Sequence, residues 1–280
     1  MDEWRFVSDS SCDMDPAEWD YAGAGLGIAP LTVTIDGVDY VDQPGTNREE
    51  MIEKMGRSRT SCSACPSIES FANEFRKAKN VICVAMTAKL SGTYNCAVQA
   101  RNLVLEEDPS RRISIVDSHA VAGVHVLLLR ELRRLHEAGL SFDEMVLRIQ
   151  SMRDNMHILF SLASFHNFIQ NGRVSRATGA IAAALRIRPV ACNSPQGEIA
   201  MLEKPRGLDA ALERMVRIAG EKKNLAGRGI VINYVDDIAP AERLKKMMLA
   251  AYPDAAYVDV LPCGCLCSYY ADRGGLLLSF

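Results

Sequence analysis

The sequence has no apolar stretch as long as the roughly 20 residues that a membrane-spanning helix needs, so we expect no membrane span. It has no block of lysine or arginine, and its net charge of −3 argues against a nucleic-acid partner. It lacks the glycine spacing of a P-loop and of a dinucleotide-binding turn. Internal repeats and low-complexity segments are absent. What remains is a globular protein of 280 residues, enough for one large or two ordinary domains.

The 9 cysteines are an odd number in a chain far larger than a disulfide-stapled miniprotein. We expect reduced thiols and, because no signal peptide precedes the first strand-like stretch, a cytoplasmic protein. Two clusters are notable: Cys62-Ser63-Ala64-Cys65 and Cys263-Gly264-Cys265-Leu266-Cys267. The second alternates, which would place three thiols on one face of a strand. A cysteine-based metal or redox protein is therefore one alternative function, but we expect small core residues and no metal.

Strand-like and helix-like segments alternate in the first half of the chain, which is typical of a mainly parallel, doubly wound sheet. The expected strands are 4–8, 28–34, 38–41, 80–85 and 113–117. The expected helices are 48–55, 66–79, 92–107, 120–138 and 141–153.

The second half is built differently, because adjacent strands are joined by the short turn Pro195-Gln196-Gly197. This favours a mixed or antiparallel α/β sheet. The expected strands are 158–161, 187–192, 198–204, 230–235, 255–261 and 276–280, and the expected helices are 165–170, 177–185, 208–222 and 239–251. We place the boundary near Asn155, which gives an N-terminal α/β domain over 1–155 and a C-terminal α/β domain over 156–280.

Two short polar segments carry the functional signal. Thr87-Ala88-Lys89-Leu90-Ser91-Gly92-Thr93-Tyr94 follows an apolar strand and leads into a helix, and Asn171-Gly172-Arg173-Val174-Ser175 precedes an alanine-rich helix. A helix that begins after small polar residues presents free N–H groups and the positive end of its dipole to an anion. We therefore expect a carboxylate, rather than a nucleotide, bound between the two domains.

Several short elements occur in an order and spacing that resemble the DegV-like bacterial fatty-acid-binding proteins. They are Val7-Ser8-Asp9-Ser10-Ser11, Pro30-Leu31-Thr32-Val33, Tyr40-Val41-Asp42, Thr60-Ser61, Leu90-Ser91-Gly92-Thr93-Tyr94, Val116-Asp117-Ser118, Asn171-Gly172-Arg173-Val174-Ser175, Ile187-Arg188-Pro189-Val190 and Lys204-Pro205-Arg206-Gly207. The resemblance spans nearly the whole chain. It departs near the end, where Tyr270 takes the place of a family histidine that is linked to the carboxylate of the ligand.

The resemblance implies a long-chain fatty acid held between the domains, with its carboxylate near the interface and its tail in a tunnel. It implies a carrier without a catalytic nucleophile or cofactor, and a separate ATP-dependent fatty acid kinase that phosphorylates the carboxylate. The ligand-binding residues that it suggests are Thr60, Ser61, Ser91, Gly92, Thr93, Gly172, Arg173 and Tyr270.

Some of these residues have structural interpretations as well. Ser91 has the character of a helix N-cap, and Arg173 is also explained as an exposed arginine that closes a helix after a glycine. Asp9 and Asp117 lie at the carboxyl ends of strands, where they either cap a turn or contact the ligand. An acyl hydrolase or transferase that uses Ser118 and His119 is a further alternative. Contiguous residues seldom form a triad, however, and no nucleophile elbow is present.

Overall fold

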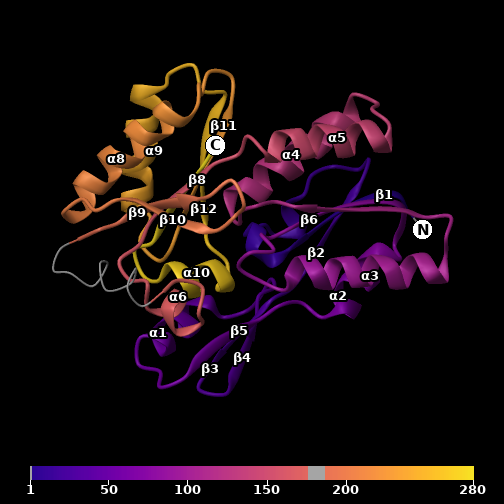
Figure 1. Ribbon diagram of the computed structural model, residues 1–280, viewed down its shortest axis with the longest axis horizontal. Coiled ribbons are helices and arrows are strands. Elements are labelled where there is room, and N and C mark those ends of the chain that lie inside the picture. Colours follow the sequence, from indigo (N-terminus) through magenta and orange to yellow (C-terminus); the bar gives the residue numbers. More distant parts are fainter. Residues whose placement is uncertain (1, 176–186) are drawn as a thin grey trace.

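The first half of the chain forms a four-stranded parallel sheet (Figure 1). This computed structural model describes residues 2–175 and 187–280. The strand order is β2-β1-β6-β7, with β1 (Asp2–Asp9), β2 (Gly25–Ala29), β6 (Ala78–Ala85) and β7 (Arg112–Asp117). Helices α2 (Ile68–Phe75) and α3 (Thr93–Glu107) cover one face, and α4 (Gly123–Glu137) and α5 (Phe142–Arg153) cover the other. The predicted doubly wound parallel sheet is confirmed.

The second half forms a six-stranded mixed sheet in the order β10-β9-β8-β13-β11-β12. Its strands are β8 (Ile158–Ser161), β9 (Val190–Asn193), β10 (Ile199–Glu203), β11 (Gly229–Tyr234), β12 (Tyr257–Pro262) and β13 (Leu276–Ser279). Among these strands only β11 and β12 pair in parallel. Helices α8 (Gly207–Lys222) and α9 (Ala239–Ala251) pack on one face, so the predicted mixed sheet is also confirmed. The helix expected at 177–185 lies outside the described residues.

Helix α4 packs against both sheets. It packs against β1 and β6 of the parallel sheet and against β11 and β13 of the mixed sheet. Its first two turns are therefore buried on every side, including Val124, Val126 and Leu128, which are fully inaccessible to solvent. Asn155 lies between α5 and β8, and we propose the division into 1–155 and 156–280 at this connection. No helix in the described part of the chain combines the length and apolar character that crossing a bilayer requires.

A small antiparallel sheet, β4-β3-β5, lies beside the domain interface; the sequence predicted its strand at 38–41 but neither β5 nor a separate sheet. Its strands are β3 (Thr32–Ile35), β4 (Val38–Val41) and β5 (Ser61–Ala64). The single strand expected at 28–34 is wrong, because Pro30 has no N–H to donate and the chain leaves the parallel sheet there. The chain continues as β3, which packs with helices α1 (Arg48–Met55) and α10 (Cys265–Ala271). The remaining described helices are α6 (His166–Gln170) and the 3₁₀ turns at Ser10–Cys12 and Pro16–Glu18.

Of the alternating cysteines near the C-terminus, Cys265 and Cys267 lie in a helix and Cys263 precedes it, so they do not form the strand face that their spacing suggested. α10 begins after Gly264, and the Ser268 N–H donates to the Gly264 carbonyl as in a helical turn. Two carboxylates from the first half of the chain determine this conformation. Asp13 Oδ1 accepts from the Gly264 N–H at 2.8 Å, and Asp42 accepts from the N–H groups of Cys265 at 2.7 Å and Leu266 at 3.1 Å. Free N–H groups at a helix start are the partners that buried carboxylates require.

Burial makes this pair of carboxylates sensitive to pH. It raises the pKa of Asp13 from its ordinary value to about 8, and the neighbouring Asp42 charge acts in the same direction. Burial raises the pKa of Asp42 as well. Asp13 Oδ2 lies 3.1 Å from the amide nitrogen of Asn233, whose own oxygen has no partner. Because an amide can be turned by 180°, that oxygen can accept the proton of a neutral Asp13.

We predict that Asp13→Asn flattens the pH dependence of stability. Between about pH 4 and 8 the native state binds more protons at Asp13 than the unfolded chain does, so the free energy of unfolding falls as pH rises. An amide does not ionise, and asparagine tolerates the left-handed backbone at this position (φ 55°). The variant should remove a slope of up to about 1.4 kcal/mol per pH unit in urea unfolding. Asp20→Asn, at an exposed carboxylate, should leave the slope as it is; an unchanged slope in Asp13→Asn would contradict the assignment.

Candidate functional site

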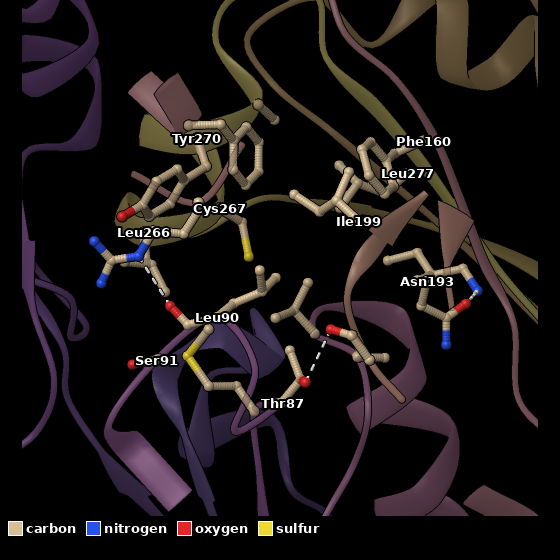
Figure 2. Close-up of a pocket in the computed structure, with 18 of the residues that line it drawn as sticks. Thr87, Leu90, Ser91, Phe160, Asn193, Ile199, Leu266, Cys267, Tyr270 and Leu277 are labelled. Carbon is tan, nitrogen blue, oxygen red and sulfur yellow. Dashed lines mark hydrogen bonds between the residues drawn. The ribbon is translucent and has the colours of Figure 1, made fainter. Parts of the chain in front are cut away.

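An elongated pocket opens where the parallel sheet, the mixed sheet and α10 meet (Figure 2). Its cavity volume is about 90 Å³, and it is open to solvent on one side. Both halves of the chain build its walls. The first half contributes the loops after β6 and β7, and the second half contributes strands β8, β9, β10 and β13 together with α10. The pocket therefore exists only when the two halves are assembled.

The body of the pocket is apolar. Figure 2 shows Leu90 and Leu266 facing Ile199, Phe160 and Leu277 across the empty space. The other apolar lining residues are Leu31, Met86, Ala120, Val121, Ile158, Leu162, Phe168 and Ala271. An apolar space with polar groups at few points is suited to a ligand with a long hydrocarbon part and one polar end.

Polar side chains lie at more than one place in the pocket: Ser91 and Tyr270 lie on one side in Figure 2, and Asn193 lies on the opposite side. Ser63 and Arg173 line the same region as Ser91 and Tyr270. These four residues come from four elements that are distant in sequence: β5, the start of α3, the loop after α6, and α10. Hydroxyl and guanidinium groups donate hydrogen bonds to a carboxylate, so this side is the candidate head-group site.

The start of α3 differs in detail from the expectation. The N-cap is Gly92, which makes no side-chain capping bond, so the N-cap interpretation of Ser91 is wrong. Ser91 lies one residue earlier, and its Oγ is 3.3 Å from the Thr93 N–H and 2.8 Å from the Thr93 hydroxyl. Thr93 is fully buried, whereas Ser91 is only partly buried and lines the pocket. Ser91 is thus the hydroxyl of this segment that lines the pocket, and it is hydrogen-bonded to Thr93.

Tyr270 is anchored on two sides. Its hydroxyl lies 2.8 Å from the Ser63 hydroxyl, and its ring packs against the ring of Phe168, with the centroids 4.7 Å apart and the planes tilted by 37°. Burial raises the pKa of the Tyr270 phenol above its ordinary value, although Ser63 and the charge of Arg173 act in the opposite direction. The phenol is therefore neutral at physiological pH and offers a hydrogen bond without a charge.

Arg173 reaches from the second half of the chain to the first. Its Nε donates to the Leu90 carbonyl at 3.0 Å, and a terminal nitrogen donates to the Asn171 carbonyl. Gly172 supplies the left-handed residue (φ 72°) that ends α6, which sends Arg173 back over the pocket. The guanidinium is exposed, and it has more N–H donors than these two hydrogen bonds use. The structure thus satisfies the helix-closing interpretation and also places Arg173 beside Tyr270 and Ser91.

Five of the eight predicted residues do not line the pocket. Thr60 is exposed, and its backbone and hydroxyl both bind the Asp36 carboxylate in a turn. The Ser61 hydroxyl contacts the Tyr269 hydroxyl at 2.9 Å, and Tyr269 in turn accepts from the amide of Asn171. Neither Thr60 nor Ser61 lines the pocket, nor do Gly92, Thr93 and Gly172.

Sequence reasoning overlooked Ser63 and Thr87. Ser63 lies two residues after Ser61, so in a strand both share one face, but β5 itself was not predicted. Thr87 closes the pocket across the domain interface, because its hydroxyl donates to the Gly197 carbonyl at 3.0 Å. Gly197 has φ 85°, and a Cβ there would lie 2.2 Å from the Thr87 hydroxyl, so only glycine fits this contact.

The structure contradicts the hydrolase alternative. The Ser118 hydroxyl is buried and donates to the Ala120 carbonyl, and its imidazole partner is His125, at 2.8 Å, rather than His119. Burial lowers the pKa of His125, which is fully enclosed and contacts Ser8 with its other nitrogen at 3.0 Å. This group fastens the loop after β7 and does not line the pocket.

The strand-end aspartates shape loops. Asp9 binds the backbone N–H groups of Ser11 and Met86, and Asp117 binds those of Ala88 and His119. A zinc site joining the cysteine clusters is not formed either. All nine cysteines are free thiols, and no group of three metal-ligating side chains converges within residues 2–175 and 187–280.

These features define a class of two-domain α/β proteins with an apolar pocket at the domain interface. The model of the DegV family of uncharacterised proteins matches residues 3–279, and the chain belongs to this family. A DegV domain-containing protein of Streptococcus gordonii is 34% identical over 282 residues, covering 99% of this chain and 98% of the relative.

Solved structures agree closely with this fold. The fatty acid kinase B3 protein of Streptococcus pneumoniae, loaded with linoleic acid, has a TM-score of 0.95 and 32% identity over 99% of both chains. A DegV family protein of Eubacterium eligens, loaded with heptadecanoic acid, has a TM-score of 0.93 and 31% identity over 99% of this chain and 98% of the other.

We predict that Ser63 and Tyr270 are energetically coupled. Ser63→Ala and Tyr270→Phe each remove the same hydroxyl contact, and phenylalanine keeps the ring on Phe168. A double-mutant cycle in urea unfolding should give a coupling of about 0.5–1.5 kcal/mol. The matched cycle of Ser61→Ala with Tyr270→Phe should be nearly additive, because Ser61 binds Tyr269 instead. Equal couplings in the two cycles would contradict the Ser63–Tyr270 contact.

Proposed function

We propose that this protein binds a long-chain fatty acid between its two domains and presents the carboxylate to a separate ATP-dependent fatty acid kinase. The observation that carries the proposal is the interdomain pocket, which is apolar along its body and has Ser63, Ser91, Arg173 and Tyr270 at one side. Two relatives with over 30% identity hold fatty acids in their solved structures. The chain then acts as a carrier and supplies no catalytic group.

Burial of the tail supplies most of the affinity. Each buried methylene contributes roughly 0.8 kcal/mol, so a chain of about fourteen methylenes gains on the order of 10 kcal/mol. A hydrogen bond to the head group adds about 1 kcal/mol, or about twice that when it is charge-assisted. The head-group donors therefore fix orientation more than they add affinity.

The carboxylate is proposed to bind beside Ser91, at the start of α3, where the serine hydroxyl is hydrogen-bonded to Thr93. The positive end of the helix dipole favours an anion there. Tyr270 contributes a neutral donor where the family resemblance implies a histidine. The proposed head-group site thus relies on Arg173 for its positive charge.

Two further parts of the proposal concern setting and partner. Kinase coupling is supported by the likeness to the fatty acid kinase B3 protein, and by the exposed position of Arg173 at the pocket. A cytoplasmic location is supported by the nine free thiols, since such thiols persist in a reducing compartment.

The direct test is extraction of the purified protein with organic solvent, followed by mass spectrometry. We expect one fatty acid for each chain, and recovery of binding when a delipidated sample is offered long-chain fatty acid. If no lipid is extracted and the delipidated protein has no affinity for fatty acids, the proposal is wrong.

We predict that Ser91→Ala weakens fatty-acid binding by about 1–2 kcal/mol, because one hydrogen bond to the carboxylate is lost while the tail stays buried. Displacement of a fluorescent fatty acid measures the affinity, and urea unfolding checks that the variant is folded. Thr60→Ala is the matched control, since its hydroxyl serves the Asp36 turn outside the pocket. Equal affinities for Ser91→Ala and Thr60→Ala would assign Ser91 to loop structure alone.

We predict that Arg173→Ala reduces phosphoryl transfer more than it reduces lipid retention, because the tail dominates binding and the guanidinium is exposed to a partner. The assay combines loaded protein, ATP and the kinase subunit of Streptococcus pneumoniae, and follows acyl phosphate formation and lipid retention together. Arg148→Ala, on the exposed face of α5, is the control. If the Arg173→Ala variant supports phosphoryl transfer at the wild-type rate, Arg173 has no role in the transfer.

A further inference from the structure

Two thiols meet beside the start of α3. The Sγ atoms of Cys65 and Cys96 lie 3.5 Å apart, although the residues are 31 positions apart in the chain. Cys65 follows β5 and is exposed, and Cys96 lies in the first turns of α3 and is partly exposed. Reagents in solution therefore reach this pair, in contrast to the six other cysteines that are buried.

The contact is close to what a disulfide needs. A disulfide brings two sulfur atoms to about 2 Å, so the thiols must approach by about 1.5 Å from their present 3.5 Å. Cys65 lies in the connection between β5 and α2, ahead of Pro66, where a small displacement breaks no helix or strand. We propose that Cys65 and Cys96 form a site of reversible oxidation, in which a peroxide converts the two thiols to a disulfide.

The chemistry balances with one peroxide. The Cys65 thiolate attacks a peroxide oxygen, the O–O bond breaks, and hydroxide leaves and takes up a proton to become water. The Cys65 sulfenic acid that results is attacked by the sulfur of Cys96, which loses its proton as the S–O bond breaks and a second water leaves. The two thiols are oxidised by two electrons, and one hydrogen peroxide is reduced to two waters. A small dithiol reverses the reaction by thiol–disulfide exchange.

The two thiols differ in environment, which assigns their roles. Burial and the contact with Cys65 raise the pKa of Cys96 to about 11, so Cys96 is a poor thiolate at neutral pH. Cys65 is exposed to solvent and to the oxidant. Cys65 is therefore the attacking thiol and Cys96 the resolving one.

The position of the pair connects it to the pocket. The site for a Cβ on Gly92 lies 3.8 Å from the Cys65 sulfur, so Cys65 touches the segment that presents Ser91. Ser63 lies two residues before Cys65, and Ser91 lies five residues before Cys96; both line the pocket. A Cys65–Cys96 disulfide would tether two walls of the mouth and restrict their local opening. Given the proposed function, we expect oxidised protein to release bound fatty acid more slowly than reduced protein.

The first experiment tests the disulfide on the full-length protein. Hydrogen peroxide is added, free thiols are alkylated, and the protein is digested without reductant for mass spectrometry. We expect a peptide pair joined through Cys65 and Cys96, two hydrogens lighter than the dithiol and separated again by dithiothreitol. Because residues 31 positions apart become linked, the oxidised protein should also melt at a higher temperature.

Matched variants test whether Cys65 and Cys96 are the two cysteines of the disulfide. Cys62→Ser removes an equally exposed thiol of β5 and should leave the linked peptide intact, whereas Cys65→Ser should abolish it. Cys96→Ser should leave a Cys65 sulfenic acid that dimedone traps. Oxidation of wild-type Cys65 to sulfinic acid without a linked peptide, or linkage of Cys65 to Cys62, overturns the proposal.

A second experiment tests the coupling to the pocket. The release rate of a fluorescent fatty acid is compared between reduced and oxidised protein, with Cys65→Ser as the sample that peroxide should not affect. Slower release by oxidised wild-type protein alone supports the coupling, and equal rates overturn it. If neither the reduced nor the oxidised protein binds fatty acid, the proposed function is refuted, while the mass-spectrometric result on the disulfide stands by itself.

Discussion

The architecture of this protein depends on two carboxyl groups, one buried and one partly buried, that accept hydrogen bonds from the N–H groups at the start of α10. Asp13 and Asp42 belong to the first half of the chain, and α10 belongs to the second. A carboxylate is costly to bury without partners, and the start of a helix has N–H groups that need acceptors. The carboxyl groups accept the hydrogen bonds that these N–H groups donate, so both sets of polar groups have partners. These hydrogen bonds fix α10 against the first half of the molecule. Leu266, Cys267 and Tyr270 then enter the pocket as a consequence.

The pocket is a property of the interface and not of either half. Helix α4 packs on both sheets, the Thr87 hydroxyl bonds to the Gly197 carbonyl, and Arg173 bonds to the Leu90 carbonyl, so three contacts hold the halves around the same empty space. Packing interiors are normally filled to crystalline density. The apolar side chains that line the pocket lack packing partners on that side, and a hydrocarbon ligand would supply the missing contacts.

The polar side of the pocket combines weak donors with one cation. Ser63 and Tyr270 bind each other, the Ser91 hydroxyl is hydrogen-bonded to Thr93, and Arg173 is exposed. Such a set distinguishes the carboxylate end of a ligand from its tail, and it leaves the carboxylate near the surface. The thiols of Cys65 and Cys96 lie beside the same segments, so redox chemistry and ligand chemistry share one edge of the molecule.

The sequence by itself determined the two sheet types, because alternating apolar strands and amphipathic helices carry local patterns that survive folding. α1, α9 and β8 have the bounds that were expected. The order of short motifs also indicated Ser91, Arg173 and Tyr270, which line one pocket. These signals are local in the chain, and tertiary contacts reinforce them.

Only the tertiary structure decided α10, β5 and the partners of the site. The cysteines at 263, 265 and 267 alternate like a strand, but carboxylates more than 200 positions away cap a helix there. Ser63 lines the site and contacts the Tyr270 hydroxyl, whereas Thr60 lies outside the site because it binds the Asp36 carboxylate. The residues next to Ser63 and Thr60 in the sequence do not indicate either contact. The sequence shows which side chains are apolar and which are polar. The free energy of burying a polar group depends on its hydrogen-bond partner, and only the folded structure determines that partner.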